Sequence, residues 1–138
     1  MFALLLRDGS RTKIEAPDLW EAMRVALRLD AVQLEMLGDT PRSMTADQVR
    51  QELALDRPGL FDAYAPGWQA PSAAEFRELL RVADLSGSQA GMLVGVDGRK
   101  IRKWASGEGE APYAVWRLLS IYAGLAAPPS QANNEITK

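Results

Sequence analysis

The stretch that most constrains the fold is residues 85–107, LSGSQAGMLVGVDGRKIRKWASG, which predicts two short helices joined by a tight turn. Ser86 can cap the first helix, and Gln89 completes a capping box three residues later. The apolar face that follows at helical spacing consists of Ala90, Leu93 and Val94. Gly95 stands where this helix must end in a backbone conformation that is costly for residues with a Cβ. Asp97 is a good N-cap for the second helix, which we expect to extend through about Ala105. We interpret the rest of the chain around this helix pair.

The second helix has a basic side chain at four of the five positions 99–103. Ile101 and Trp104 lie three residues apart and are expected to face the core. The positions left outside hold Arg99, Lys100, Arg102 and Lys103. The nearest acids are Asp97, which is needed at the cap, and Glu108 and Glu110 beyond the helix end. A surface that contacts phosphates and base edges explains this cluster better than a solvated helix face with paired charges.

In its order of residues the stretch resembles the helix-turn-helix of the Cro/repressor (XRE) family of DNA-binding proteins. The matching features are Leu85-Ser86, the small Ala90, the Gly95-Val96 turn, Ile101 with Trp104, and Gly107. The resemblance covers residues 72–125 without a gap and implies an all-helical domain with helix 97–105 in the major groove. The sequence departs from the family at Gly87, where Gln is frequent, and at Gly98, which has no side chain to read a base.

The resemblance also implies which residues contact double-stranded DNA. These are Ser86, Ser88, Gln89, Gly98, Arg99, Lys100, Arg102 and Lys103. Arg99 and Lys103 are the expected base readers, whereas Lys100 and Arg102 are expected to lie toward the flanking phosphates. The amino end of the first helix points at the DNA backbone in this fold, where free N–H groups and hydroxyls bind phosphate.

Composition argues against other kinds of function. The chain has no cysteine and no histidine, which excludes disulfides, structural zinc of the usual kind and the commonest general base at neutral pH. We find no carboxylate pair in a recognisable acid/base arrangement and no Gly-rich phosphate loop. We therefore expect no enzyme, no cofactor and no metal site. Apolar runs are too short for a membrane span or a signal peptide, so we expect a soluble cytoplasmic protein.

The charge is divided unevenly along the chain. The net charge is −2, but residues 1–71 carry eight basic and eleven acidic side chains, whereas residues 72–125 carry seven basic and six acidic ones. Electrostatic screening confines such charges to about 8–10 Å in physiological salt, so the acidic first half does not prevent DNA binding by a basic patch elsewhere.

The first half predicts a small unit that contains strands. FALLLR and SRTKIEA flank Asp8-Gly9, a pair that favours a two-residue type I′ hairpin turn. A helix from Asp18 to Leu29 follows, whose inward residues should be Trp20, Met23, Ala26 and Leu27. Residues 31–37 alternate as a third strand, and Thr45 with Gln48 begins another helix, which would bury Val49 and Leu53.

The predicted fold class is α+β: a small ββαβ(α) unit followed by an all-α repressor-like domain. The predicted parts are residues 1–55, a Pro/Gly-rich connector at 56–71, the DNA-binding domain at 72–125 and a mobile tail at 126–138. The connector aromatics, Phe61, Tyr64 and Trp68, are expected to pack on one of the domains. Ser72 with Glu75 should form a capping box at the first helix of the DNA-binding domain, and the last helix should have Pro112 as its first residue.

The leading hypothesis is a dimeric, sequence-specific DNA-binding repressor whose residues 1–55 supply dimerisation. One alternative is an antitoxin-like or adaptor protein, in which the first domain binds a partner protein and the helix pair autoregulates its operon. A third and weaker alternative is a regulator that senses a small molecule through the first domain.

Overall fold

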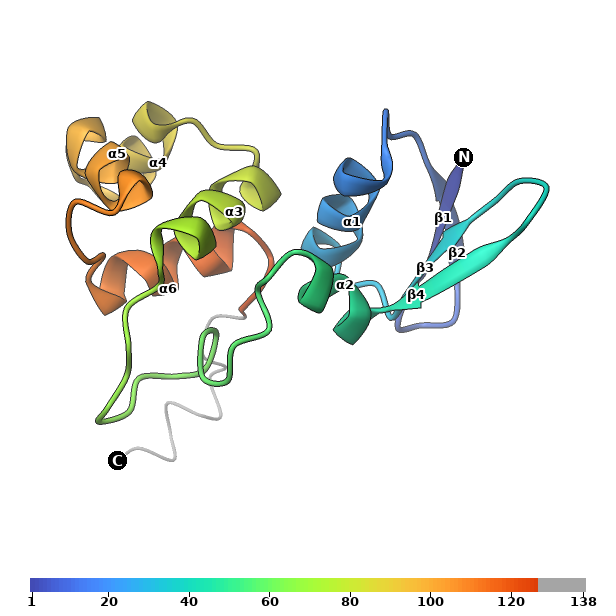
Figure 1. Ribbon diagram of the computed structural model, residues 1–138, viewed down its shortest axis with the longest axis horizontal. Helices are drawn as coiled ribbons and strands as arrows, with labels where there is room; N and C mark the ends of the chain where they lie inside the picture. The colour runs from blue at the N-terminus through green and yellow to red at the C-terminus, as the bar shows by residue number, and fades with distance from the viewer. Residues whose placement is uncertain (127–138) are drawn as a thin grey trace.

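The computed structural model describes residues 1–126 and begins with a four-stranded antiparallel sheet (Figure 1). Its strands are β1 (Phe2–Leu5), β2 (Arg11–Ile14), β3 (Gln33–Met36) and β4 (Arg42–Thr45), in the order β2-β1-β3-β4. The α+β class is confirmed, but β4 was not predicted. Only Met44 of this short strand is partly buried, and Thr45 also caps the next helix, so the segment has little apolar alternation. The expected tail lies outside the described residues, except for Ala126.

The β1–β2 hairpin differs from its prediction in the turn. The N–H of Leu6 donates to the Ser10 carbonyl at 2.9 Å, and the N–H of Gly9 donates to the Leu6 carbonyl at 3.0 Å. Only Gly9, with φ 87°, is left-handed, and the Asp8 carboxylate accepts from the Ser10 N–H at 2.8 Å. The loop is therefore one residue longer than a two-residue type I′ turn, and that prediction was wrong.

Two helices cover one face of the sheet, α1 (Leu19–Arg28) and α2 (Ala46–Glu52). Leu4 and Leu34 are partners across β1 and β3, and both are fully buried in the same hydrophobic cluster as Met23 and Val49. Trp20 was expected inside, but 48% of it is exposed. Ala22 takes the inward position instead, because the buried stripe of α1 runs through residues 22, 23, 26 and 27.

The second half is helical. It contains α3 (Ala73–Ala83), α4 (Gly87–Val94), α5 (Gly98–Ser106) and α6 (Tyr113–Tyr122). The capping boxes predicted at Ser72 and Ser86 are both present. Pro112 was predicted to be the first residue of α6, but the helix begins one residue later, at Tyr113, and Pro112 is its N-cap. No helix among the described residues has the length and apolar character needed to cross a membrane.

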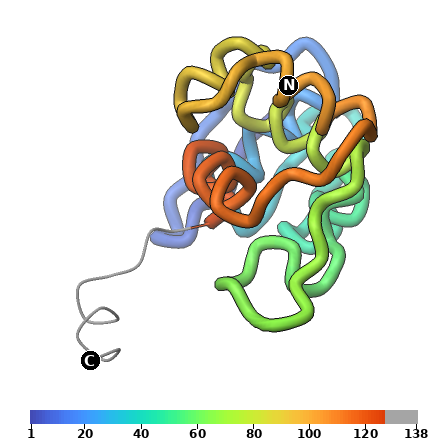
Figure 2. Tube along the Cα trace, turned by 90° about the vertical axis from the view of Figure 1, so that its left-hand side faces the viewer, coloured from blue at the N-terminus to red at the C-terminus, as the bar shows by residue number. Residues whose placement is uncertain are grey.

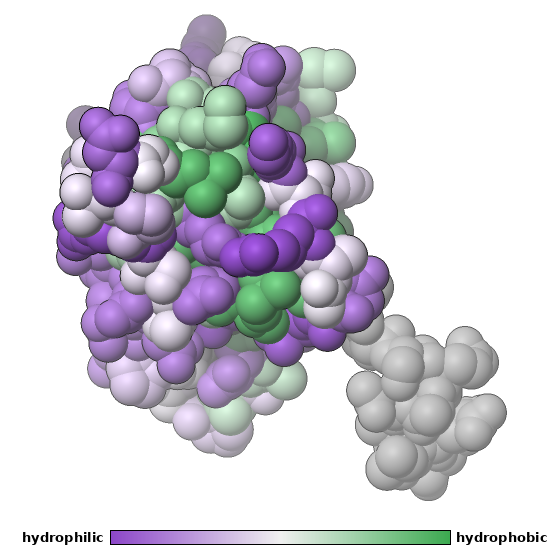
Figure 3. Space-filling view, turned by 90° about the vertical axis from the view of Figure 1, so that its right-hand side faces the viewer, coloured by the Kyte–Doolittle hydropathy of each residue, from purple (hydrophilic) through white to green (hydrophobic). Residues whose placement is uncertain are grey.

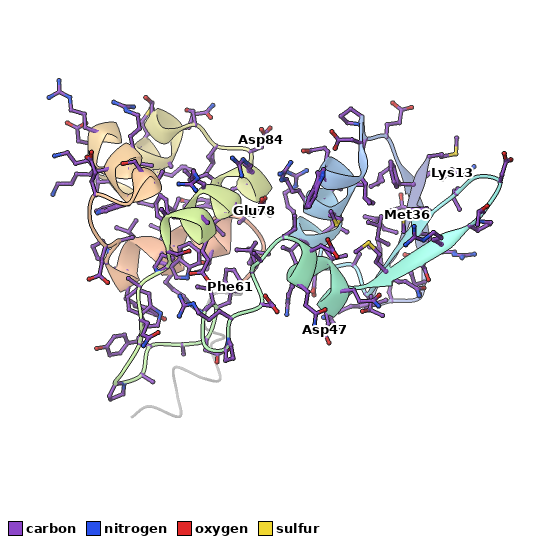
Figure 4. All side chains as sticks on the ribbon, in the orientation of Figure 1. Lys13, Met36, Asp47, Phe61, Glu78 and Asp84 are labelled. Carbon is purple, nitrogen blue, oxygen red and sulfur yellow. The ribbon has the colours of Figure 1, made fainter. Side chains whose placement is uncertain are left out.

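The two halves share one hydrophobic core, and α1 lies between the sheet and α3 (Figure 1). The Arg24 guanidinium donates to the Glu78 carboxylate, with Nε and Oε2 2.8 Å apart, and Arg28 donates to the Val82 carbonyl at 3.0 Å. Glu78 lies on the side of α3 that faces α1 (Figure 4). These contacts hold the sheet half against the helical half.

The 56–71 connector packs on α3 and α6, and its path over the helical half is visible in Figure 2. Leu60 is buried, and its carbonyl accepts a 2.7 Å hydrogen bond from Trp116 Nε1. Phe61 stacks on the same ring at 5.6 Å between centroids. Trp68 meets Tyr113 edge to face, as does Tyr64, although 63% of Tyr64 is exposed. The prediction that these aromatics pack on a domain is confirmed.

An ion pair fastens the same connector to the start of α3. Arg57 Nε lies 3.0 Å from Glu75 Oε2, and the Glu75 side chain is only 11% exposed. Burial alone would raise the pKa of the Glu75 carboxyl, but hydrogen bonds from Arg57 and from the Ser72 N–H, together with the charge of Arg57, lower that pKa below its ordinary value. The carboxylate is therefore held in its charged form.

Candidate nucleic-acid interface

Glycines set the close approach of α4 and α5. A Cβ on Gly91 would lie 2.5 Å from the Val96 carbonyl oxygen, a distance that real Cβ atoms do not adopt. Gly95 ends α4 with φ 76°, as expected, and the N–H groups of Gly95 and Val96 both donate to the Gly91 carbonyl. The two helices are thereby joined by a turn with little freedom to open.

The inner side of the pair packs on α3 and α6. Ala90 and Ile101 are fully buried, as the spacing predicted. Trp104 is only partly buried: its ring meets Phe76 edge to face, with centroids 6.1 Å apart, at the rim of the core. Leu93 was expected to face inward but is 39% exposed. The short α4 buries only its Ala90 and Gly91 side, so Leu93 lies beyond the packed stripe.

The outer side of α5 carries the basic cluster. The side chains of Arg99, Lys100, Arg102 and Lys103 are all exposed. Within residues 1–126 no ion pair links any of them to an acid. Asp97 is occupied as the N-cap and accepts from the Arg99 N–H at 2.8 Å. Figure 4 shows nitrogen-tipped side chains extending from α5 away from the rest of the molecule.

The amino end of α4 lies beside the amino end of α5. Ser86 and Gln89 are engaged in the capping box, in which the Gln89 N–H donates to the Ser86 hydroxyl at 3.1 Å and the Ser86 N–H donates to the Gln89 side-chain oxygen at 2.9 Å. The exposed Ser88 lies next to Gly98: a Cβ on Gly98 would be 3.3 Å from Ser88 Cα and 3.5 Å from its hydroxyl oxygen. Arg102 reaches the same place, since its Nη1 would lie 3.4 Å from that Cβ.

The structure thus brings Ser88, Gly98 and Arg102 together and leaves Arg99 and Lys103 one turn apart on the exposed side of α5. Their contacts with DNA stay predictions. Sequence reasoning missed the role of Arg77, whose guanidinium donates from α3 to the Ala105 carbonyl near the end of α5. No local sequence signal marks this contact, because the two residues are 28 positions apart.

No group of three or more acidic, histidine or cysteine side chains in residues 1–126 could hold a metal ion. The titratable residues of the α4–α5 surface are the four cations and Asp97, and the latter is used in capping. The arrangement can therefore attract and hydrogen-bond an anion of extended shape, and the backbone of a nucleic acid is such an anion.

Comparison with known proteins finds two related repressors. Each is described as the transcriptional repressor protein KorC of Escherichia coli. One is 44% identical over 64 residues, which is 44% of this chain and 75% of that repressor. The other is 38% identical over 66 residues, which is 46% of this chain and 78% of that repressor. No family model matches the chain, and no solved structure matches it.

Proposed function

The chain belongs to the family of the KorC transcriptional repressors, and from this premise we propose that it is a sequence-specific DNA-binding repressor of the helix-turn-helix, Cro/repressor type. The observation that carries the proposal is the exposed cation cluster of α5. Its four charges have no acidic partner in residues 1–126 and lie beside the amino end of a second helix. Such a surface attracts and binds a polyanion such as DNA.

In this proposal α5 lies in the major groove. Arg99 and Lys103 are one turn apart and read base edges, and a bidentate arginine contact to guanine O6 and N7 supplies part of the specificity. Lys100 and Arg102 bind flanking phosphates, which fixes the position of α5 without selecting a sequence. The DNA backbone next to this groove is proposed to contact the amino ends of α4 and α5, at Ser86, Ser88, Gln89 and Gly98. The protein acts on DNA in the cytoplasm.

We further propose that two copies act together. One recognition helix contacts few base pairs, and a single small module binds too weakly for useful selectivity. A dimer would read two half-sites whose centres are about 34–36 Å apart, or a multiple of that distance. Residues 1–55 are proposed to hold the copies together. Figure 3 shows the side of the molecule that carries the sheet, where polar side chains lie across apolar ones. In this half, Arg11 of β2 donates a hydrogen bond to Glu35 of β3 at 2.9 Å, across the intervening strand β1.

A protein partner is the second candidate, because one groove in the first half suits it. The groove has a volume of about 490 Å³ between α1, β4 and α2, and its lining includes Trp20, Met23 and Met44. Within residues 1–126 β4 pairs only with β3, and its other edge, unpaired in this part of the chain, could accept a strand. An antitoxin-like or adaptor role would use this groove, and a second chain that copurifies with the protein would support it.

A charge-matched comparison tests the proposal. One variant replaces Arg99, Lys100, Arg102 and Lys103 with Gln, and its control replaces the exposed Arg7, Arg11, Lys13 and Arg42 with Gln. Both lose the same number of charges, so the overall charge does not distinguish them. Anisotropy of a labelled duplex should show that the α5 variant loses binding by about 10³-fold at low salt while the control keeps most of it. Sedimentation must first show that both variants keep the oligomeric state of the unchanged chain, because the control changes residues of the proposed dimerisation half. Equal losses in two such variants would contradict a local interface on α5.

A further inference from the structure

Gly87 and Gly98, the two departures from the Cro/repressor pattern, lie under one arginine. A Cβ on Gly87 would lie 3.1 Å from Arg102 Cγ and 3.7 Å from its Nη1, and a Cβ on Gly98 would lie 3.4 Å from the same Nη1. The side chain of Arg102 therefore runs back along α5 by one turn and lies over both glycines. Neither glycine has a positive φ, so neither is needed for backbone conformation.

A side chain at either position would crowd this conformation of Arg102. Contacts of 3.1–3.4 Å are tighter than most real Cβ contacts, so any side chain at 87 would push the stem of Arg102 outward. At 98 the new Cβ would also meet Ser88 Cα at 3.3 Å, which is backbone and cannot swing away. Glycine is among the residues that favour a helix least, so its presence as the first residue of both α4 and α5 agrees with a steric reason.

We propose that Gly87 and Gly98 are positioning residues, which leave room for Arg102 to pack over the start of both helices in the conformation that binds a phosphate. Arg102 has no acidic partner within residues 1–126, and its side chain packs over the first residues of α4 and α5. A guanidinium that packs there loses less conformational freedom when it binds an anion than one extended into solvent. The glycines thus act through Arg102 and add to the proposed function, on which this inference depends.

A double-mutant cycle tests the proposal. The four proteins are the unchanged chain, Gly87→Ala, Arg102→Ala and the double variant, each titrated with a labelled mixed-sequence duplex of roughly two helical turns, ~20 bp. Gly87→Ala should keep or raise the melting temperature, because alanine favours helix over glycine. It should nevertheless weaken binding by about threefold to tenfold, and Arg102→Ala should weaken it by at least as much. Once Arg102 is absent, Gly87→Ala should change nothing further.

Two readouts separate this positioning effect from a structural one. Arg102→Ala should reduce the slope of log affinity against log salt by about 1, and Gly87→Ala should reduce it in the same direction. The control cycle pairs Gly87→Ala with Lys100→Ala, where the two losses should multiply, because Lys100 does not lie over Gly87.

The outcomes are distinguishable. If Gly87→Ala leaves binding unchanged, or weakens it equally with and without Arg102, the positioning role is overturned while DNA binding stands. If the unchanged chain binds no duplex at low salt, the proposed function itself fails.

Discussion

At the scale of single residues, the proposal separates two neighbouring cations by role. Arg99→Ala should relax base preference and cost on the order of 1–3 kcal/mol on the best operator, because a bidentate base contact is lost. Lys100→Ala should weaken all sequences alike and reduce the salt slope by about 1. Competition between operator and mixed-sequence duplexes measures both. An Arg99→Ala protein with unchanged affinity and consensus would mean that α5 is placed in the groove in a different register.

The buried Glu75 makes stability depend on pH in a window that its pKa defines. The folded-state pKa lies below the ordinary value of 4.5, so the unfolded chain binds more protons as pH falls through that value. The stabilisation is therefore complete above about pH 4.5 and is lost as the pH falls toward the folded pKa. In urea unfolding, the free energy of unfolding of the Glu75→Gln variant should fall less across this pH window than that of the unchanged chain.

Asp30 provides a control for this pH effect. Its pKa is also lowered, first by a hydrogen bond from Arg7, but 53% of its side chain is exposed. Solvent screening weakens such a pair, so Asp30→Asn should change the pH dependence less than Glu75→Gln. The reverse order would contradict the role given to the Arg57–Glu75 pair.

At the scale of elements, Trp104 fastens α5 to α3 through its contact with Phe76. Trp104→Ala should lower the free energy of unfolding by about 2–4 kcal/mol, somewhat less than for a fully buried tryptophan because part of the ring is already exposed. Trp20→Ala, on the outer side of α1, should cost less. A Trp104→Ala protein that melts normally but has lost DNA binding would make Trp104 a contact residue.

The elements also show what the sequence could predict. Caps and terminators are local, and Ser72, Ser86, Asp97 and Gly95 were all assigned correctly from their neighbours in the chain. Burial on a helix depends on what packs against it, which is why Trp20 and Leu93 were wrongly expected inside. β4 was missed because it is defined by pairing with β3 rather than by its own pattern. The packing of Arg102 over two glycines could not be predicted either, because it depends on how α4 and α5 pack against each other.

At the scale of the whole molecule, the connector belongs structurally to the helical half. A fragment of residues 56–126 keeps Leu60 and Phe61 on Trp116, whereas a fragment of residues 71–126 exposes that ring and leaves its Nε1 without the Leu60 carbonyl. The shorter fragment should therefore be less stable by about 3–5 kcal/mol, in line with the loss of a large buried apolar contact. Equal urea midpoints for the two fragments would contradict this reading of the connector.

The same fragments test the proposed division of labour. If residues 1–55 hold the dimer together, residues 56–126 should sediment as a monomer and bind one half-site weakly, while the intact chain is dimeric. A dimeric fragment that binds a two-half-site duplex as tightly as the intact chain would assign dimerisation to the helical half. Tight binding is needed for this conclusion because removing α1 also exposes the face of α3 that packs on it. That result would leave the groove beside β4 for a partner protein.

If the proposed function is right, the intact chain reads DNA sequence as a dimer through α5. Selection of bound sequences from random duplexes tests it most directly. We expect a palindromic consensus with half-site centres about 34–36 Å apart, or a multiple of that, and the loss of specific positions from the consensus with Arg99→Ala. A selection that yields no consensus, or one that is the same for the unchanged and Arg99→Ala proteins, would contradict the account.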